Sequence, residues 1–260
     1  MTQIFNIDWE EKNNRHNGEL FPNSIRGIII GKSGCGKTNL LHNLLLSPSM
    51  LDYDNLIVYG KSLNQPKYKI LKCGFDNNLD KESIFNFFNN RDEIIKKDIS
   101  PYQLLQEIGK TFRNENPIKC QYFDSDNEVL DPKELNSASK NLMIFDDVLL
   151  EKQNKCNDYY TRGRHNNVDC FYLSQNYFRL PRQTIRENSN FICLFKQDNK
   201  NIQHIYNDHA SHDMKYEEFK NLCKLCWSQP YNFLTIDNTS HPNNGKYRLN
   251  FDTFYFLKNG

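Results

Sequence analysis

The feature that most constrains the fold of this chain is a glycine-rich octapeptide set between an apolar run and a leucine-rich run. The apolar run, residues 25–30, predicts a buried strand, and residues 39–46 favour a helix that ends near Pro48. In this context glycines turn backbone N–H groups inward around phosphate oxygens. The sequence therefore predicts a phosphate-binding loop made of Gly31, Lys32, Ser33, Gly34, Cys35, Gly36, Lys37 and Thr38.

Two side chains at the end of this loop carry its chemistry. Lys37 is expected to reach the β- and γ-phosphates of a nucleoside triphosphate, and the Thr38 hydroxyl is expected to ligate Mg²⁺. The start of the following helix adds a partial positive charge at the same place. We therefore predict a P-loop ATPase with ATP and Mg²⁺ as cofactors, because an unrelated glycine-rich turn would not need both flanking elements.

Four further apolar runs predict the rest of a sheet. They are continuous rather than alternating, and helical stretches lie between them. Strands that are buried on both faces and separated by helices are typical of the α/β class, with a central, mainly parallel sheet flanked by helices. The four runs lie at residues 56–59, 142–145, 170–174 and 191–195.

The remaining segments set the expected domain boundaries. Residues 1–24 are polar and are expected to form an irregular lead-in or a short strand before an ATPase domain over residues 25–260. Residues 61–140 are expected to be a helical insertion between the two nucleotide-binding motifs, with a short strand at residues 120–123. Residues 231–255 are expected to add one or two strands, with a hairpin as one arrangement.

Polar side chains follow two of the predicted strands. Asp146 and Asp147 end one of them, and Gln175 directly follows the next. Ligands bind at the carboxyl ends of strands in open α/β sheets, so we expect all three side chains near the phosphate loop. Asp146 would hold Mg²⁺ directly or through water, and Asp147 would orient or deprotonate the attacking water. Gln175 would hold that water or sense the γ-phosphate; solvated turn residues are the alternative in each case.

Two arginines precede the strand that ends before Gln175. Phosphoryl transfer gains from an arginine directed at the γ-phosphate, often from a neighbouring subunit, and we expect Arg162 or Arg164 to act in this way. An exposed basic turn is the alternative. A second basic cluster could contact nucleic-acid phosphates, another subunit or only solvent, and consists of Arg179, Arg182 and Arg186.

Charge and composition limit the partners. Lys and Arg number 33 and Asp and Glu number 32, so any nucleic-acid contact must come from a local patch rather than from a basic surface. No apolar run approaches the roughly 20 residues that span a bilayer. The N-terminus lacks a basic segment followed by an apolar stretch, so we expect an intracellular protein whose eight cysteines are reduced thiols.

Two spaced pairs near the C-terminus invite a zinc hypothesis. Cys223 and Cys226 have metal-like spacing, and His209 and His212 precede them. The cysteines also fit the buried face of a helix predicted over residues 216–226, and the two pairs match no standard zinc-finger spacing. We therefore favour cysteines that pack in the core, with zinc binding as the alternative.

With these residues in place, the chain resembles the poxvirus-type DNA-packaging ATPases of the FtsK–HerA superfamily, especially those of virophages and polinton-like elements. The similar stretches cover most of residues 25–225. The block from Arg162 to Gln175 is more specific than the phosphate loop. Many relatives end the acidic strand with Asp-Glu, whereas this chain has Asp-Asp, which gives Asp147 a shorter arm for the same role. The stretches are residues 28–41, 141–148, 158–168, 172–178 and 185–190.

The resemblance implies a function as well as a RecA/FtsK-like fold. It implies a homo-oligomeric ring, pentamer or hexamer, with double-stranded DNA through its centre. ATP hydrolysis at the subunit interfaces would drive that DNA into a preformed capsid, with viral capsid proteins as further partners. It supports Arg162 or Arg164 as the trans-acting arginine and Gln175 as the sensor. The expected location is a virus assembly site in the host cytoplasm or nucleus, with association with the virion as an alternative.

Two other functions compete with this one. A small-molecule or nucleotide kinase would need an arginine-bearing lid, and the sequence shows no clear one; a monomer indifferent to DNA would favour it. An ATP-binding assembly switch with little hydrolysis would promote association without movement, and an assay of translocation on a long duplex separates it from a motor.

Overall fold

The computed structural model of the chain describes residues 15–96, 99–111 and 114–257. In these residues nine strands form one sheet with the order β3-β2-β4-β5-β1-β6-β7-β8-β9. Strands β3 to β6 of this order run parallel, and β7, β8 and β9 are antiparallel. The α/β fold predicted from the sequence is therefore confirmed. The strands are β1 Arg26–Ile30, β2 Asn55–Gly60, β3 Lys119–Phe123, β4 Asn141–Asp146, β5 Val168–Ser174, β6 Phe191–Leu194, β7 Leu234–Asp237, β8 Tyr247–Leu249 and β9 Thr253–Tyr255.

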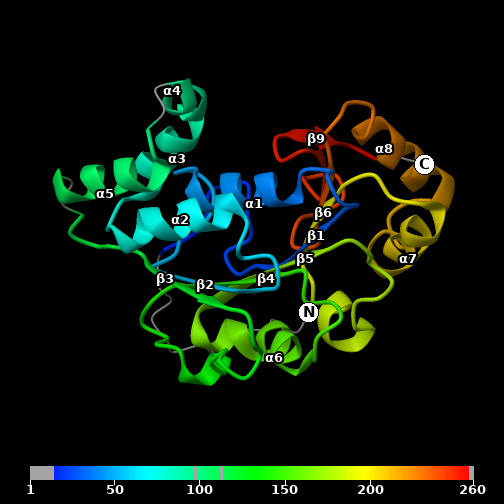
Figure 1. Cartoon of the computed structure of the whole chain (residues 1–260). Helices are drawn as coiled ribbons and strands as arrows, with labels where there is room; N and C mark the ends of the chain where they lie inside the picture. Colours follow the sequence, from blue (N-terminus) through cyan, green and yellow to red (C-terminus); the bar gives the residue numbers. More distant parts are fainter. Residues whose placement is uncertain (1–14, 97–98, 112–113, 258–260) are drawn as a thin grey trace.

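Helices cover both faces of the sheet (Figure 1). Alternate strand residues point to opposite faces, so Ile29 packs in one hydrophobic core and Ile28 and Ile30 in the other. Every residue of β4 and β5 is buried, which explains why these strands are continuous apolar runs in the sequence. One face carries α1 Lys37–Leu46, α2 Pro66–Asp76, α3 Lys81–Asn89, α4 Arg91–Lys96 and α5 Pro101–Thr111; the other carries α6 Asn154–Arg162, α7 Asn199–His209 and α8 Tyr216–Cys226.

The segment between β2 and β4 contains α2, α3, α4, α5 and the short strand β3. Strand β3 pairs in parallel with β2, with Leu56 opposite Cys120, so this segment extends the main sheet at its edge. Helices α2 and α3 contribute Tyr68, Leu71 and Ile84 to the core on their face. The segment is thus packed into the fold rather than attached to its surface.

The two ends of the described chain differ in how well they were predicted. Residues 15–24 form no regular element, and the rest of the predicted lead-in, residues 1–14, lies outside the described residues. The C-terminal part adds three strands, rather than the one or two expected, and they form an antiparallel meander. Strands β8 and β9 have three residues each, which is too short to show an alternating pattern in the sequence.

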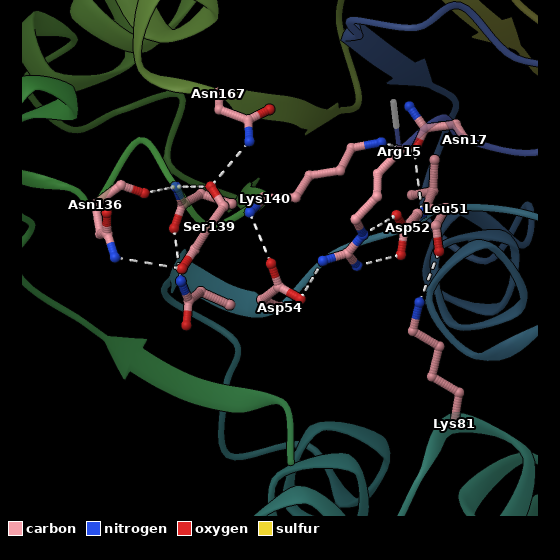
Figure 2. Close-up of polar contacts among 12 residues, drawn as sticks. Arg15, Asn17, Leu51, Asp52, Asp54, Lys81, Asn136, Ser139, Lys140 and Asn167 are labelled. Carbon is pink, nitrogen blue, oxygen red and sulfur yellow. Dashed lines mark hydrogen bonds and ion pairs between the residues drawn. The ribbon is translucent and has the colours of Figure 1, made fainter. Parts of the chain in front are cut away.

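Polar and charged side chains hold residues 15–17 at the end of the sheet where β2 and β4 begin (Figure 2). The Arg15 guanidinium donates to Asp52 at 2.6 Å and to Asp54 at 2.5 Å. Asp54 also accepts from the backbone N–H of Lys140 at 2.8 Å, and Asn17 donates to the buried carboxylate of Asp169 at 2.9 Å. This cluster lies at the opposite ends of the strands from the phosphate loop.

Candidate functional site

The phosphate loop joins the end of β1 to the start of α1. Gly34 and Gly36 have φ angles of 77° and 109°, which glycine adopts without a steric penalty. Gly36 is the residue that caps α1, so backbone N–H groups face the pocket at the helix start. The Lys37 ammonium donates to the loop carbonyls of Gly31 at 2.6 Å and of Lys32 at 3.1 Å, which holds it over the loop.

Parallel strand ends bring the predicted polar side chains to this loop. The order β4-β5-β1 puts the acidic strand two places from the loop strand, and the Gly31 N–H donates to the Ser174 carbonyl at 3.1 Å. A pocket of about 500 Å³ lies at this edge, and Asp146, Asp147 and Gln175 line it together with Lys37. The other lining residues are Ser33, Gly34, Gly36, Thr38, Asn39, Ser62, Gln65, Lys67, Leu173 and Tyr231.

Asp146 is the buried carboxylate of the pocket. It is 8% exposed, and the Tyr68 hydroxyl donates to its Oδ2 atom at 2.6 Å. Burial raises the pKa of Asp146 above its usual value, and the nearby Asp147 adds to this, while the Tyr68 hydrogen bond and the Lys37 charge oppose it. A cation at the pocket would compensate this desolvated negative charge.

The pocket's donor set fits Mg²⁺. Two carboxylates, the Thr38 hydroxyl and the Gln175 amide all present oxygen, which Mg²⁺ prefers over nitrogen and sulfur. Among the described residues no group of three or more His, Cys, Asp or Glu side chains forms a metal cage. A Mg²⁺ ion held by one or two carboxylates together with phosphates of a substrate needs no such cage.

Asp147 has an unusual backbone conformation. Its φ angle is 59°, in the left-handed region that asparagine and aspartate tolerate better than other non-glycine residues. Its side chain is exposed at the pocket, whereas that of Asp146 is buried. The two adjacent carboxylates therefore have different environments, one desolvated and one in contact with water.

Sequence reasoning missed the contribution to this pocket of residues 62–68, the loop after β2 and the first turn of α2. Ser62, Gln65 and Lys67 line it, and Tyr68 bonds to Asp146. Residues 61–140 matched no pattern with a known role, so no function was assigned to them. The sequence did hold one signal, because this segment directly follows the strand predicted at residues 56–59 and the carboxyl ends of parallel strands meet. In the structure Gly60 pairs with Asp146, and the Lys61 N–H donates to the Asp146 carbonyl at 3.3 Å.

The two predicted trans-acting arginines lie away from the pocket of their own chain. Arg162 is at the end of α6, with its side chain 77% exposed and its guanidinium 3.7 Å from Asp158. Arg164 is exposed in the short 3₁₀ helix Gly163–Asn166 that follows. Neither residue lines the pocket at the end of β1 and β4. A role across a subunit interface stays a prediction.

The second basic cluster is not a single surface patch. Arg186 is 5% exposed, and its Nε donates to the Asp208 carboxylate on α7 at 2.8 Å. The expectation that Arg186 faces nucleic acid, another subunit or solvent is therefore wrong, because its guanidinium is buried inside its own chain. Asp208 compensates the charge there, as a buried guanidinium requires. Arg182 is exposed and lies 3.1 Å from Glu187, and Arg179 is also exposed.

Helix α7 holds the segment that carries Gln175. Two residues beyond Gln175, the Tyr177 hydroxyl donates to Asp208 at 2.8 Å and lies 2.6 Å from Nε2 of His209. The Phe178 N–H donates to the Asn201 side chain at 3.2 Å. Arg186, Asp208 and Tyr177 therefore form one network that fixes the strand end next to the pocket.

His209 makes this network sensitive to acid. Because Tyr177 gives its proton to Asp208, Nε2 of His209 is the donor to Tyr177, and Nδ1 accepts from Asn238 at 3.0 Å. Burial lowers the pKa of His209 to about 4; Lys246 and Arg186 lower it further, and Asp208 opposes them. The folded protein thus favours the neutral ring.

We expect the His209 contribution to the free energy of unfolding to fall by up to about 3 kcal/mol as the pH is lowered from 6.5 to 4, because the unfolded chain binds a proton on this ring more tightly than the folded chain does. Urea denaturation at several pH values measures this. His209→Gln should flatten the dependence in that window, and His212→Gln, at an exposed position, should leave it intact. Parallel curves for both variants would contradict the assignment.

The Cys223–Cys226 pair packs in the core, as favoured from the sequence. Cys223 and Cys226 lie on α8 with 0% and 1% exposure, and burial raises the pKa of Cys226 to about 12. All eight cysteines are free thiols. His209 is engaged with Tyr177 and Asn238, so the described residues bring no third metal donor to the Cys223–Cys226 pair.

Comparisons with known proteins identify the fold. No protein-family model matches the chain, and no curated protein matches its sequence. Solved structures of the genome packaging NTPase B204 from Sulfolobus turreted icosahedral virus 2 are similar to it. The complex with AMPPCP has a TM-score of 0.52 at 10% identity and covers 88% of this chain and 98% of that chain. The complex with AMP has 0.51 at 12%, covering 89% and 98%, and the complex with sulfate has 0.51 at 12%, covering 91% and 100%.

At this level of identity the likeness shows the fold. The chain has the α/β P-loop fold of an NTPase, as the sequence predicted, with a viral genome packaging NTPase among its structural neighbours. In the described part of the chain, no helix has the length and apolar character that crossing a bilayer requires.

Proposed function

We propose that this chain, which shares the fold of the packaging NTPase B204, is an Mg²⁺-dependent ATPase that drives double-stranded DNA into a preformed viral capsid. The observation that carries the proposal is a single pocket in which a P-loop lysine faces two strand-end carboxylates and an amide. A phosphate-binding loop alone would fit many nucleotide-binding proteins. The added carboxylates and amide supply what hydrolysis of the terminal phosphate needs.

Each group has a distinct task in this reaction. The loop N–H groups and Lys37 would bind the β- and γ-phosphates, and Thr38 and Asp146 would hold Mg²⁺, which would supply positive charge to the phosphate oxygens. Asp147, exposed at the pocket, orients the attacking water and accepts its proton. The Gln175 amide positions that water without titrating, and α7 keeps it in place through Tyr177.

The proposed assembly places each nucleotide site at a boundary between two subunits. Arg162 and Arg164 are exposed and lie outside the pocket of their own chain, as a residue that completes a neighbouring site must. We propose a pentameric or hexameric ring with DNA in its centre and capsid proteins as partners, acting at virus assembly sites in the host cell. The near-neutral charge, with 33 basic and 32 acidic residues, is compatible with DNA contacts confined to such a channel.

We expect ATP hydrolysis by the full chain to be stimulated by double-stranded DNA and to be lost in Lys37→Ala, because Lys37 neutralises the phosphates in the ground and transition states. Phosphate release with and without a long duplex measures both effects. Lys72→Ala, which removes an exposed ammonium paired with Asp76 on α2, should retain both activities. An ATPase rate that does not change with DNA would contradict the proposed DNA translocation. An unchanged ATPase rate in Lys37→Ala would contradict the proposed catalytic site.

A further inference from the structure

Tyr231 stands out among the residues that line the nucleotide pocket. It lies in the loop between α8 and β7, and its side chain is 71% exposed. Its aromatic ring differs from the other described residues of the pocket lining, most of which are polar. A Cβ placed on Gly36 would lie 3.4 Å from the Tyr231 Cδ1 atom, so the ring borders the phosphate loop. A single exposed aromatic side chain needs no functional explanation by itself. The backbone conformation of Tyr231 supplies a second observation.

The backbone at Tyr231 is strained. The Asn232 N–H donates to the Gln229 carbonyl at 3.4 Å, which closes a turn with Pro230 at its second position and Tyr231 at its third. The φ angle of Tyr231 is 65°. Proline followed by a residue of positive φ is the pattern of a type II turn, where glycine or asparagine is favoured at the third position. Tyrosine there carries a steric penalty that a largely exposed ring does not offset by packing.

We propose that Tyr231 is the base-binding residue of this site, with its ring stacked on the nucleobase of a nucleoside triphosphate whose phosphates lie in the loop. The inference rests on the proposed nucleotide site and extends it to the part of the substrate beyond the phosphates. Lys37, Thr38 and the carboxylates can recognise only the phosphate end and its metal. The Tyr231 ring gives this pocket an aromatic surface on which a nucleobase can stack. Every nucleobase has a π-face that can stack in this way.

The test compares ATP with inorganic tripolyphosphate, both with Mg²⁺, by calorimetric titration of the full chain. Tyr231→Asn removes the ring and keeps a residue that accepts positive φ. It should weaken ATP binding by roughly 5- to 150-fold, the range expected for loss of one stacked base, and leave tripolyphosphate affinity within about 2-fold. Tyr231→Phe keeps the ring and should bind ATP within about 3-fold of the wild-type Kd.

Thermal unfolding separates binding from folding. Because Asn removes the strain of tyrosine at positive φ, Tyr231→Asn should have a Tm equal to or above that of the wild type. Three results would overturn the inference: an unchanged ATP Kd in Tyr231→Asn, an equal loss of ATP and tripolyphosphate affinity, or a Tm lowered by more than about 4 °C, which is the shift expected for a lost packing contact. Failure of the proposed nucleotide site is a different outcome, in which the wild type binds neither ligand.

Discussion

Asp147→Asn is expected to lower kcat for ATP hydrolysis by about 10²–10⁴-fold while leaving the ATP Kd within about 3-fold. The exposed Asp147 carboxylate faces the same pocket as Lys37, and in the proposed mechanism it accepts the proton of the attacking water. An amide of the same shape can still contact that water, but it cannot take the proton. The loss should therefore fall on the chemical step rather than on substrate binding.

The choice of asparagine follows from the backbone. Asp147 has a φ of 59°, which asparagine tolerates, whereas alanine would add strain and mix a folding defect with a catalytic one. Single-turnover phosphate release and equilibrium binding of ATP separate the two effects. Asp92→Asn, at an exposed α4 carboxylate, is the matched control and should behave as wild type. Wild-type kcat in Asp147→Asn would show that another group activates the water.

Arg186→Met should lower the free energy of unfolding by about 3–5 kcal/mol, a loss of roughly 6–20 °C in Tm. Arg186 and Asp208 are 6% and 8% exposed at their side chains, and removal of the guanidinium leaves the Asp208 carboxylate buried without its cationic partner. Calorimetry or urea denaturation measures the change. The Tyr177 hydroxyl, which donates to the same carboxylate, cannot neutralise its charge.

The matched control comes from the same turn of chain. Arg182→Met removes an arginine that is 68% exposed and pairs with Glu187, so it should change stability by less than about 1 kcal/mol. A double change, Arg186→Met with Asp208→Leu, should recover much of the loss because no unpaired charge then remains buried. Equal effects of the two arginine variants would contradict a buried, structural role for Arg186.

The parts of the site that follow a strand could be predicted from the sequence. The loop from Gly31 to Thr38 could be recognised from its local sequence pattern, because a strand precedes it and a helix follows it. Asp146 and Gln175 could be placed beside it because parallel strands end at a common edge, and they do line its pocket. Neither step needs knowledge of side-chain contacts between distant segments.

The parts that depend on distant contacts were missed. Tyr68 reaches Asp146 from a segment with no recognisable pattern, 78 positions away in the chain. Tyr231 comes from the loop before an antiparallel strand, and its backbone angle is invisible in the residue sequence. In the sequence Arg186 resembled the exposed arginines Arg179 and Arg182, because its partner Asp208 lies 22 residues further on and on another helix. Local periodicity carries no information about such pairs.

The polar cluster around Arg15 has a consequence at the far end of β4. Lys140, the residue before this strand, is held by Asp54 through its backbone N–H, and Asp146 closes the same strand six residues later. Side chains alternate along a strand, so a slip of β4 against β2 that put Phe145 opposite Gly60 would turn the Asp146 carboxylate away from the P-loop and bring a phenylalanine there instead. The contacts at one end of β4 therefore set the register of the strand, and with it which side chain faces the P-loop at the other end.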